Sequence, residues 1–196
     1  MEGLTIQNPA GLVIPACLKG GGLILPFRGK HPLIGKRVFL APQSSVIGEV
    51  ALGDDVSIWF GVVIRGDIAC IEVGRGSNIQ DNTVLHVGDE DPCLVGEDVV
   101  VGHGAVLHGC RIQDRCTIGM GAVVLNGALI EEEAVVGAGA LVPPRMVVPP
   151  RALALGQPAR IVRELSAEEL EQYAVFAPKY VRVAEAYRQS DVFPDM

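Results

Sequence analysis

Aliphatic residues recur at every sixth position through most of the chain, and this period restricts the fold more than any other sequence feature. A period of six fits neither the turn of an α-helix nor the simple alternation of a long β-strand. It is typical of a parallel β-helix, in which each hexad supplies one short strand and one corner. The sequence therefore predicts an all-β solenoid of hexapeptide repeats. The repeating positions are Leu40, Val46, Leu52, Ile58 and Ile64, then Val73, Ile79 and Leu85, then Val95, Val101 and Leu107, then Ile112, Ile118, Val124, Ile130, Val136 and Val142.

The order of the hexads predicts a triangular prism with three flat faces. Three hexads, about eighteen residues, complete one coil, and successive coils stack at the spacing of paired strands, about 4.8 Å. The first residue of each hexad points into the prism, and the fifth is often small or β-branched, as at Val56, Ala105 and Ala122. We expect the β-helix to span residues 38–150, with residues 1–37 as an N-terminal segment that covers the first coil.

The segment after residue 150 changes character and predicts a linker followed by a C-terminal helix. The run Gly156-Gln157-Pro158-Ala159-Arg160 is typical of a linker. The run Ser166-Ala167-Glu168-Glu169 has the pattern of a capping box, and apolar residues continue at helical spacing to about Gln189. Pro178 should kink or divide this helix. We expect residues 151–196 to pack along the β-helix, so that the chain forms a single domain.

Composition and charge argue against several classes of partner and location. The 196 residues carry a formal charge of −7 without a basic stripe, which disfavours nucleic acid as a partner. The apolar run from Gly11 to Leu25 is interrupted by Pro15, Lys19 and three glycines, so it predicts neither a signal peptide nor a membrane span. Five cysteines without a Cys-x-x-Cys pair indicate reduced thiols in a cytoplasmic protein.

Three of the four histidines, His86, His103 and His108, lie within one short stretch of the sequence. Neutral imidazole nitrogens are the donors of a catalytic zinc site, which keeps a fourth position open for water. The hexad register predicts which of these side chains can meet. Hexads that are three apart share a face of the prism. Arg65, His86 and His108 therefore form one outward-pointing column on a face that we call face A.

Asp81 and His103 form a second column on a different face, which we call face C. His103 therefore cannot easily reach His86 and His108 within one chain, but it can do so when face A of one prism docks against face C of the next. Such a heterologous contact closes into a ring with three copies. The same docking predicts a salt bridge between Arg65 and Asp81 of neighbouring subunits, beneath a metal ion shared by the three histidines.

The hexad array and several short motifs resemble the gamma-class carbonic anhydrase family, in particular its bacterial, short-looped members. The likeness extends from about residue 10 to residue 188. It implies a left-handed β-helix homotrimer, in which two histidines of one subunit and one of its neighbour hold zinc, with iron or cobalt as alternatives. The motifs are Arg65-Gly66-Asp67, Asn78-Ile79-Gln80-Asp81-Asn82, Leu85-His86, Gly102-His103-x4-His108-Gly109 and Gly156-x-Pro158-Ala159-Arg160.

The activity that this resemblance implies is the reversible hydration of CO2 to bicarbonate by a metal-bound hydroxide. Gln80 would hydrogen-bond the metal-bound water or the bicarbonate, and Asn78 is a second candidate for the same place. By similarity to short-looped relatives, Tyr180 on the C-terminal helix would overhang the pocket, and its alternative role is packing in the apolar stripe. Three further residues resemble interface residues that orient the metal ligands. They are Arg65, Asp67 and Asp81.

The loop after the first histidine departs from the family prototype. The prototype has a long acidic loop with a glutamate that shuttles protons, whereas only residues 87–94 intervene here. Ile68 also stands where the prototype has a glutamate. Asp89, Glu90 or Asp91 would relay protons, or else the acidic run is a solvated loop without that role. Some short-looped relatives have weak hydration activity, and some act on acyl-CoA thioesters.

Three other functions remain open from the sequence. A thioesterase would use the same metal-activated water on an acyl-CoA carbonyl. A hexapeptide acyltransferase would use one histidine as a base without a metal. That class usually carries a projecting loop, and the sequence offers only residues 87–94 for it. A non-catalytic trimeric scaffold is the third alternative, and it leaves the histidine pattern unexplained.

Overall fold

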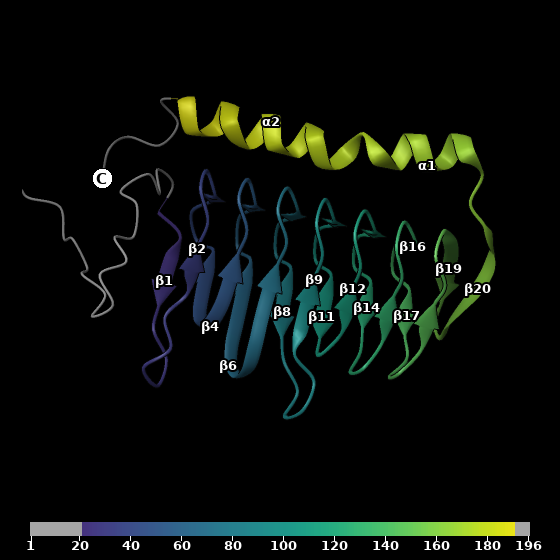
Figure 1. Ribbon diagram of the computed structural model, residues 1–196, viewed down its shortest axis with the longest axis horizontal. Helices are drawn as coiled ribbons and strands as arrows, with labels where there is room; N and C mark the ends of the chain where they lie inside the picture. Colours follow the sequence, from purple (N-terminus) through teal and green to yellow (C-terminus); the bar gives the residue numbers. More distant parts are fainter. Residues whose placement is uncertain (1–20, 191–196) are drawn as a thin grey trace, which may run out of the picture.

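The computed structural model describes residues 21–190, which form a parallel β-solenoid with a helical segment laid along it (Figure 1). This confirms the β-helix that the hexads predict. The strands pair into a sheet of eight strands and a sheet of twelve. The eight-stranded sheet is face C. Its strands are β3 (Phe39–Leu40), β5 (Ser57–Ile58), β7 (Asn78–Ile79), β10 (Val100–Val101), β13 (Thr117–Ile118), β16 (Val135–Val136), β19 (Ala152–Gly156) and β20 (Ala159–Glu164).

The twelve-stranded sheet supplies the other two faces of the prism, face A and a remaining face that we call face B. Two long strands, β4 (Ser45–Leu52) and β6 (Val63–Val73), run through the corner and belong to both faces. Face A continues with β1 (Leu23–Leu25), β8 (Val84–His86), β11 (Val106–His108), β14 (Val123–Val124) and β17 (Leu141–Val142). Face B continues with β2 (Leu33–Ile34), β9 (Cys93–Val95), β12 (Arg111–Ile112), β15 (Leu129–Ile130) and β18 (Val147–Val148).

The core is a stack of the inward aliphatic residues. Ile64, Leu85 and Leu107 pair in register on successive coils of face A, and each side chain is fully buried. Small fifth-position residues such as Ala105 are also fully buried, so the chain turns the corner without crowding the interior. Each buried leucine or isoleucine contributes about 1.5–3 kcal/mol through removal of its surface from water. Regular repetition of this burial from coil to coil stabilises the solenoid.

A break in the hexad pattern after Ile64 shapes the region around the histidines. Here β4 and β6 pair straight across the corner, with a register shift between Gly48 and Val50. Gly48 adopts a φ of +80°, and a Cβ at this position would lie 2.3 Å from the carbonyl oxygen of Gly66. Only glycine permits this close approach of the two strands. The extra residues of the break include Asp67, which reaches the histidine column of face A.

The ends of the β-helix differ from the expected boundaries at residues 38 and 150. Strands β1 and β2 pair with β4, through Leu23 with Ser45 and Leu33 with Ala51, so part of the expected cover segment contributes to the first coil. Residues 1–20 lie outside the described residues. At the other end, β19 and β20 form an antiparallel pair where we expected a linker. Residues 21–37 and 152–164 therefore extend the sheets instead of lying outside them.

The C-terminal segment forms two helices, α1 (Ala167–Ala174) and α2 (Phe176–Gln189). The predicted capping box is present, because Glu169 N donates to Ser166 Oγ at 3.3 Å and Ser166 N donates to the Glu169 carboxylate at 2.9 Å. The division falls at Val175 rather than at Pro178. Pro178 lies in the first turn of α2, where a missing N–H costs no helical hydrogen bond.

Helix α2 lies along the solenoid and contacts β3, β5 and β7 of face C (Figure 1). An aromatic cluster fills this contact, with Trp59 against Phe39, Tyr180 and Tyr187 at ring-centroid distances of 5.2, 5.8 and 5.4 Å. Within residues 21–190, neither helix is long and apolar enough to cross a membrane.

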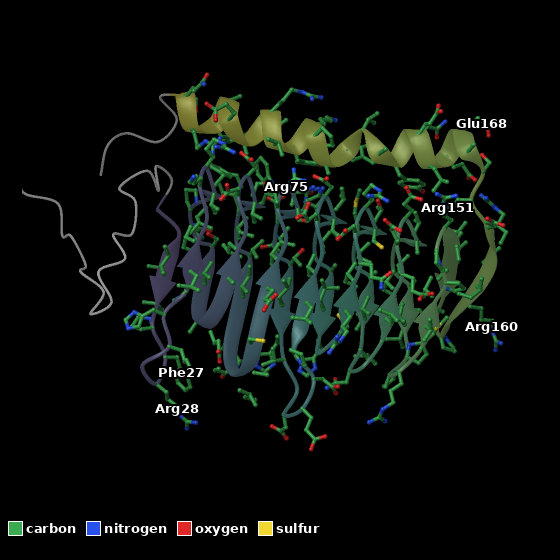
Figure 2. All side chains as sticks on the ribbon, viewed as in Figure 1. Phe27, Arg28, Arg75, Arg151, Arg160 and Glu168 are labelled. Atoms are coloured by element: carbon green, nitrogen blue, oxygen red, sulfur yellow. The ribbon has the colours of Figure 1, made fainter. Side chains whose placement is uncertain are left out.

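Charged residues form ion pairs between coils along one edge of the prism. Arg37 pairs with Asp55 at 2.6 Å, Arg75 with Glu97 at 2.7 Å, and Arg151 with Glu133 at 2.6 Å. Arg75 and Arg151 lie on the edge that faces the helices (Figure 2). The acidic loop between β8 and β9 projects from the opposite edge (Figure 1). One edge of the prism therefore carries ion pairs and faces the helices, whereas the opposite edge carries the acidic loop between β8 and β9.

Candidate metal centre

His86 and His108 lie side by side on adjacent coils of face A. Parallel pairing of β8 with β11 places the two residues directly opposite each other, as the hexad register predicts. Nδ1 of His86 lies 3.1 Å from Nε2 of His108, and the ring centroids are 5.1 Å apart. The two side chains thus present one nitrogen each to a common point at the surface of the prism.

Asp67 holds the outer nitrogen of His86. Its Oδ1 atom lies 2.9 Å from Nε2 of His86, and its other carboxylate oxygen pairs with Arg65. Burial alone would raise the pKa of Asp67, but hydrogen bonds from His86 and Arg65 outweigh burial and lower the pKa. An ionised carboxylate only accepts hydrogen bonds, so Nε2 of His86 donates, and in the neutral imidazole Nδ1 keeps its lone pair. That lone pair points toward His108.

Asn126 contacts the outer nitrogen of His108, and sequence reasoning did not find it. Oδ1 of Asn126 lies 2.8 Å from Nδ1 of His108, and Nδ2 of Asn126 donates to Asp91 at 3.3 Å. Because Leu107 pairs with Val124, Asn126 lies at the corner one coil beyond the histidine. The sequence signal that could have identified Asn126 is its polar side chain, which follows shortly after an aliphatic hexad position, Val124.

The acidic loop contains residues in two different situations. Asp89 and Glu90 are exposed at its tip, as expected for groups in contact with solvent. Asp91 is half-buried and accepts the hydrogen bond from Asn126. Asp91 is therefore anchored to the histidine column through Asn126, and the loop is not simply solvated surface.

His103 lies on a different face from the other two histidines, again as the register predicts. It follows β10 on face C, where its Nδ1 atom lies 2.7 Å from Oδ2 of Asp81, and 46% of its side chain is exposed. Asp81 also accepts from Gly104 N through its backbone oxygen at 2.8 Å. In the described part of a single chain, no group of three or more histidine, cysteine, aspartate or glutamate side chains is arranged to hold a metal ion.

Asn78, Gln80 and Tyr180 lie with Asp81 on the face-C side of the molecule. Gln80 Nε2 donates to Asn78 Oδ1 at 3.1 Å, and both side chains are buried. Asn78 Nδ2 has no hydrogen-bond partner within the described residues. Burial raises the pKa of Tyr180, and the negative charge of Asp81 raises it further, which indicates that the phenol lies near that carboxylate.

The predicted salt bridge between Arg65 and Asp81 of neighbouring subunits stays a prediction. Within one chain Arg65 pairs with Asp67, and Asp81 pairs with His103. The candidate residues thus separate into two clusters. The face-A cluster comprises Arg65, Asp67, His86, His108 and Asn126, and the face-C cluster comprises Asn78, Gln80, Asp81, His103 and Tyr180.

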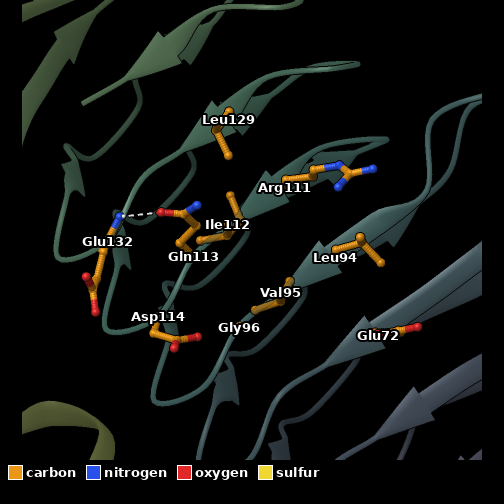
Figure 3. Close-up of a pocket in the computed structure, with 10 residues that line it drawn as sticks. All are labelled: Glu72, Leu94, Val95, Gly96, Arg111, Ile112, Gln113, Asp114, Leu129 and Glu132. Atoms are coloured by element: carbon orange, nitrogen blue, oxygen red, sulfur yellow. Dashed lines mark hydrogen bonds between the residues drawn. The ribbon is translucent and has the colours of Figure 1, made fainter. Parts of the chain in front are cut away.

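A cavity of about 660 Å³ lies on face B, away from both clusters (Figure 3). Its wall includes Glu72, Leu94, Arg111 and Leu129, from strands β6, β9, β12 and β15. A hydrogen bond of 3.0 Å from Glu132 N to Gln113 Oε1 crosses one end. None of the predicted site residues lines this cavity.

Proteins with similar sequences show which group the chain belongs to. An Arabidopsis thaliana protein named gamma carbonic anhydrase 2, mitochondrial, is 43% identical over 164 residues, which cover 81% of this chain and 59% of that protein. A probable carbonic anhydrase of Methanocaldococcus jannaschii is 48% identical over 153 residues, 78% of this chain and 96% of that relative. The chain belongs to the gamma carbonic anhydrase family. No protein-family model matches it.

Solved structures agree with the hexapeptide-repeat fold of this gamma carbonic anhydrase family member. A Bacillus cereus protein described as a putative acetyltransferase has a TM-score of 0.83 and 39% sequence identity, and the match covers 85% of this chain and 97% of that one. The chain spans about 59% of the length of the plant gamma carbonic anhydrase. The two residue clusters of this family member lie on two faces, so each chain carries two separate parts of the candidate centre.

Proposed function

We propose that this chain catalyses the reversible hydration of CO2 to bicarbonate at a metal ion held between the subunits of a homotrimer. The observation that carries the proposal is the 3.1 Å approach of two histidine nitrogens, one of which presents a lone pair because Asp67 accepts its opposite N–H. Two such nitrogens that face each other at this distance are arranged for a cation between them.

The donor set fits a divalent transition metal. Two imidazole nitrogens bound at about 2.0–2.1 Å to one tetrahedral metal lie about 3.3 Å apart, close to the spacing of His86 and His108. A third ligand, His103 of a neighbouring subunit, would leave the fourth position open for water. We propose zinc, and iron or cobalt suits the same nitrogens. When bound, the metal would supply a water molecule acidified enough to react at neutral pH.

The surface around the face-A cluster supports an interface at this place. Beside the histidine column runs a second outward column of apolar residues, paired in register from coil to coil. Its residues are Val63, Val84, Val106, Val123 and Leu141. An apolar stripe next to charged and metal-binding groups is typical of an interface between subunits. We propose that face C of the next subunit covers it, which brings the exposed His103 to the metal.

The remaining residues have proposed roles that follow from their contacts. Asp67 orients His86, and Asp81 orients His103 through its hydrogen bond at 2.7 Å. Gln80 would bind the reacting water or bicarbonate, with its amide held by Asn78 at 3.1 Å. Tyr180, packed on Trp59, would close the side of the pocket nearest to Asp81.

A second candidate function, acyl transfer, has one specific observation in its favour, the similarity to the Bacillus cereus structure described as a putative acetyltransferase. Acyl transfer with a histidine base would need no metal. A metal-free mechanism of this kind would leave unexplained why the contact with Asp67 directs a lone pair of His86 toward His108. Metal dependence therefore separates the two functions.

We also propose that the chain works in the cytoplasm, where thiols stay reduced. Cys93, Cys110 and Cys116 are buried in the core as free thiols, and burial raises the pKa of Cys116 to about 12. Such thiols behave as small apolar side chains.

The test is to purify the chain without a histidine tag, quantify metal per chain, and assay CO2 hydration before and after chelation and repletion with zinc or iron. The proposal expects metal in the purified protein, loss of hydration on chelation, and recovery with one of the metals. The variant His108→Gln should lose both metal and activity, whereas His31→Gln, which changes the one histidine outside the cluster, should lose neither. A metal-free protein with undiminished acyltransferase activity would contradict the proposal.

A further inference from the structure

We infer that Asp91 and Asn126 are positioning residues that set the tautomer of His108 and thereby make its Nε2 atom a metal ligand. The inference rests on the proposed function in one respect, namely that His86 and His108 bind a metal ion. It assigns a role to the acidic loop that differs from proton relay, and it gives His108 a partner that the sequence motifs do not contain.

The direction of each hydrogen bond in this chain of groups follows from which atoms can donate. The Asp91 carboxylate accepts from Nδ2 of Asn126 at 3.3 Å, and this contact fixes which way the Asn126 amide points. Oδ1 of Asn126 therefore faces His108, 2.8 Å from Nδ1. An amide oxygen only accepts, so Nδ1 of His108 carries a proton, and in the neutral imidazole Nε2 carries the lone pair. The loop carboxylate thus acts on a histidine that it does not touch.

The backbone around Asn126 leaves space for this contact at two glycines. A Cβ at Gly88 would lie 2.3 Å from Nδ2 of Asn126. A Cβ at Gly109, which has a φ of +57°, would lie 2.8 Å from Cβ of Asp91 and 3.0 Å from Nδ2 of Asn126. Gly88 N also donates to the backbone oxygen of Asp91 at 2.9 Å, which closes the loop over the amide. The loop conformation and the amide position therefore depend on each other.

The two histidines are oriented in different ways. His86 has a carboxylate, Asp67, directly on its outer nitrogen, whereas His108 has a neutral amide with a carboxylate behind it. Without Asn126, neutral His108 would populate the tautomer that directs an N–H at His86, and this tautomer cannot bind a metal at Nε2. Partners of this kind change metal affinity by about 10–100-fold when they are removed.

The experiment compares Asn126→Leu and Asp91→Ala, each of which removes one partner of the hydrogen bond between these residues, with the wild-type full-length chain. The tautomer of His108 is determined from imidazole 15N chemical shifts of the metal-depleted protein, and affinity for Zn²⁺ and Co²⁺ is measured by competition with a chelator. We expect the wild type to show the Nδ1–H form, and each variant to shift toward the Nε2–H form with metal affinity about 10–100-fold weaker. Asp89→Asn, in the same loop but exposed, should change neither quantity.

A double substitution distinguishes positioning from a merely structural role. Combining Asp91→Asn with Asn126→Asp keeps an acceptor toward His108 and reverses the donor and acceptor between positions 91 and 126. We expect this variant to recover the Nδ1–H tautomer and most of the metal affinity. Unchanged tautomer and affinity in both single variants, or no recovery in the double variant, would overturn the inference. If the tautomer and affinity respond as expected but the loaded protein does not hydrate CO2, the proposed function fails and the positioning role stands.

Discussion

Nδ1 of His86 and Nε2 of His108 lie 3.1 Å apart although 22 positions separate the two residues in the sequence. His103, only five positions before His108, lies on another face of the prism. This inversion of sequence and spatial neighbours follows from the coil: residues one full turn apart stack, and residues one corner apart diverge. A metal centre that uses all three histidines therefore needs more than one chain.

Removal of the Asp67 charge should weaken metal binding without unfolding the chain. The variant Asp67→Asn loses the ionised acceptor that holds Nε2 of His86 and the partner of Arg65. We expect about 10–100-fold weaker Zn²⁺ affinity, measured by competition with a chelator. Asp98→Asn, at a corner near Arg75, is the matched control and should bind as the wild type does. Equal affinities of the two variants would contradict the orienting role of Asp67.

A charge in the apolar column of face A should break the oligomer. Val84 points outward, is 36% exposed in a single chain, and lies two residues before His86 on the same strand. Because an aspartate there would bury a charge against the neighbouring subunit, we expect Val84→Asp to sediment as a monomer and to lose bound metal. Val147→Asp changes a residue that is 51% exposed on face B and should remain oligomeric. Sedimentation that is unchanged in Val84→Asp would place the interface elsewhere.

The fold and the pairing of His86 with His108 follow from the sequence because a six-residue period dictates which side chains stack. The strands at the two ends do not follow from it, since β1 and β2 are separated by a hairpin at residues 27–30 and not by a hexad corner. The helix division at Val175 also differs from the expectation. The steric effect of Pro178 is exerted on the residues before it, so the break comes earlier.

Asn126 could not be predicted from periodicity. Its role depends on the direction of a side-chain amide, and that direction is set by Asp91, which lies 35 positions earlier in a loop without repeat character. The role of the Asp67 carboxylate also could not be predicted from periodicity, because Asp67 lies where the six-residue repeat is interrupted. Regular positions thus locate the ligands, whereas irregular positions supply the groups that orient them.

Ion pairing of Glu133 should stabilise the chain at neutral pH and cease to do so in acid. Hydrogen bonds from Arg151, and then from Arg115, lower the pKa of Glu133 against the effect of burial. A folded-state pKa below the unfolded value adds stability above the unfolded pKa, near 4.5, and this stability disappears as pH falls through the folded pKa.

The variant Glu133→Gln should therefore lower the free energy of unfolding at pH 7 by about 1 kcal/mol or less, since the pair is partly exposed. Urea titrations at pH 7 and near pH 3 measure the difference from wild type, which should shrink in acid. Glu131→Gln is the control, because in the described part of the chain Glu131 forms no ion pair. A difference that is the same at both pH values would show that the charge of Glu133 is not responsible.

The most direct test of a centre shared between subunits mixes two inactive variants, His103→Ala and His86→Ala. Neither homotrimer has a complete ligand set, but each mixed ring contains one interface where His86 and His108 of the first variant meet His103 of the second. We expect mixed trimers to recover about one third of the metal content and CO2 hydration of the wild type. The control mixture, His86→Ala with His108→Ala, should recover none, because both changes affect the same side of every interface. Recovery in neither mixture, or equal recovery in both, would contradict the shared centre.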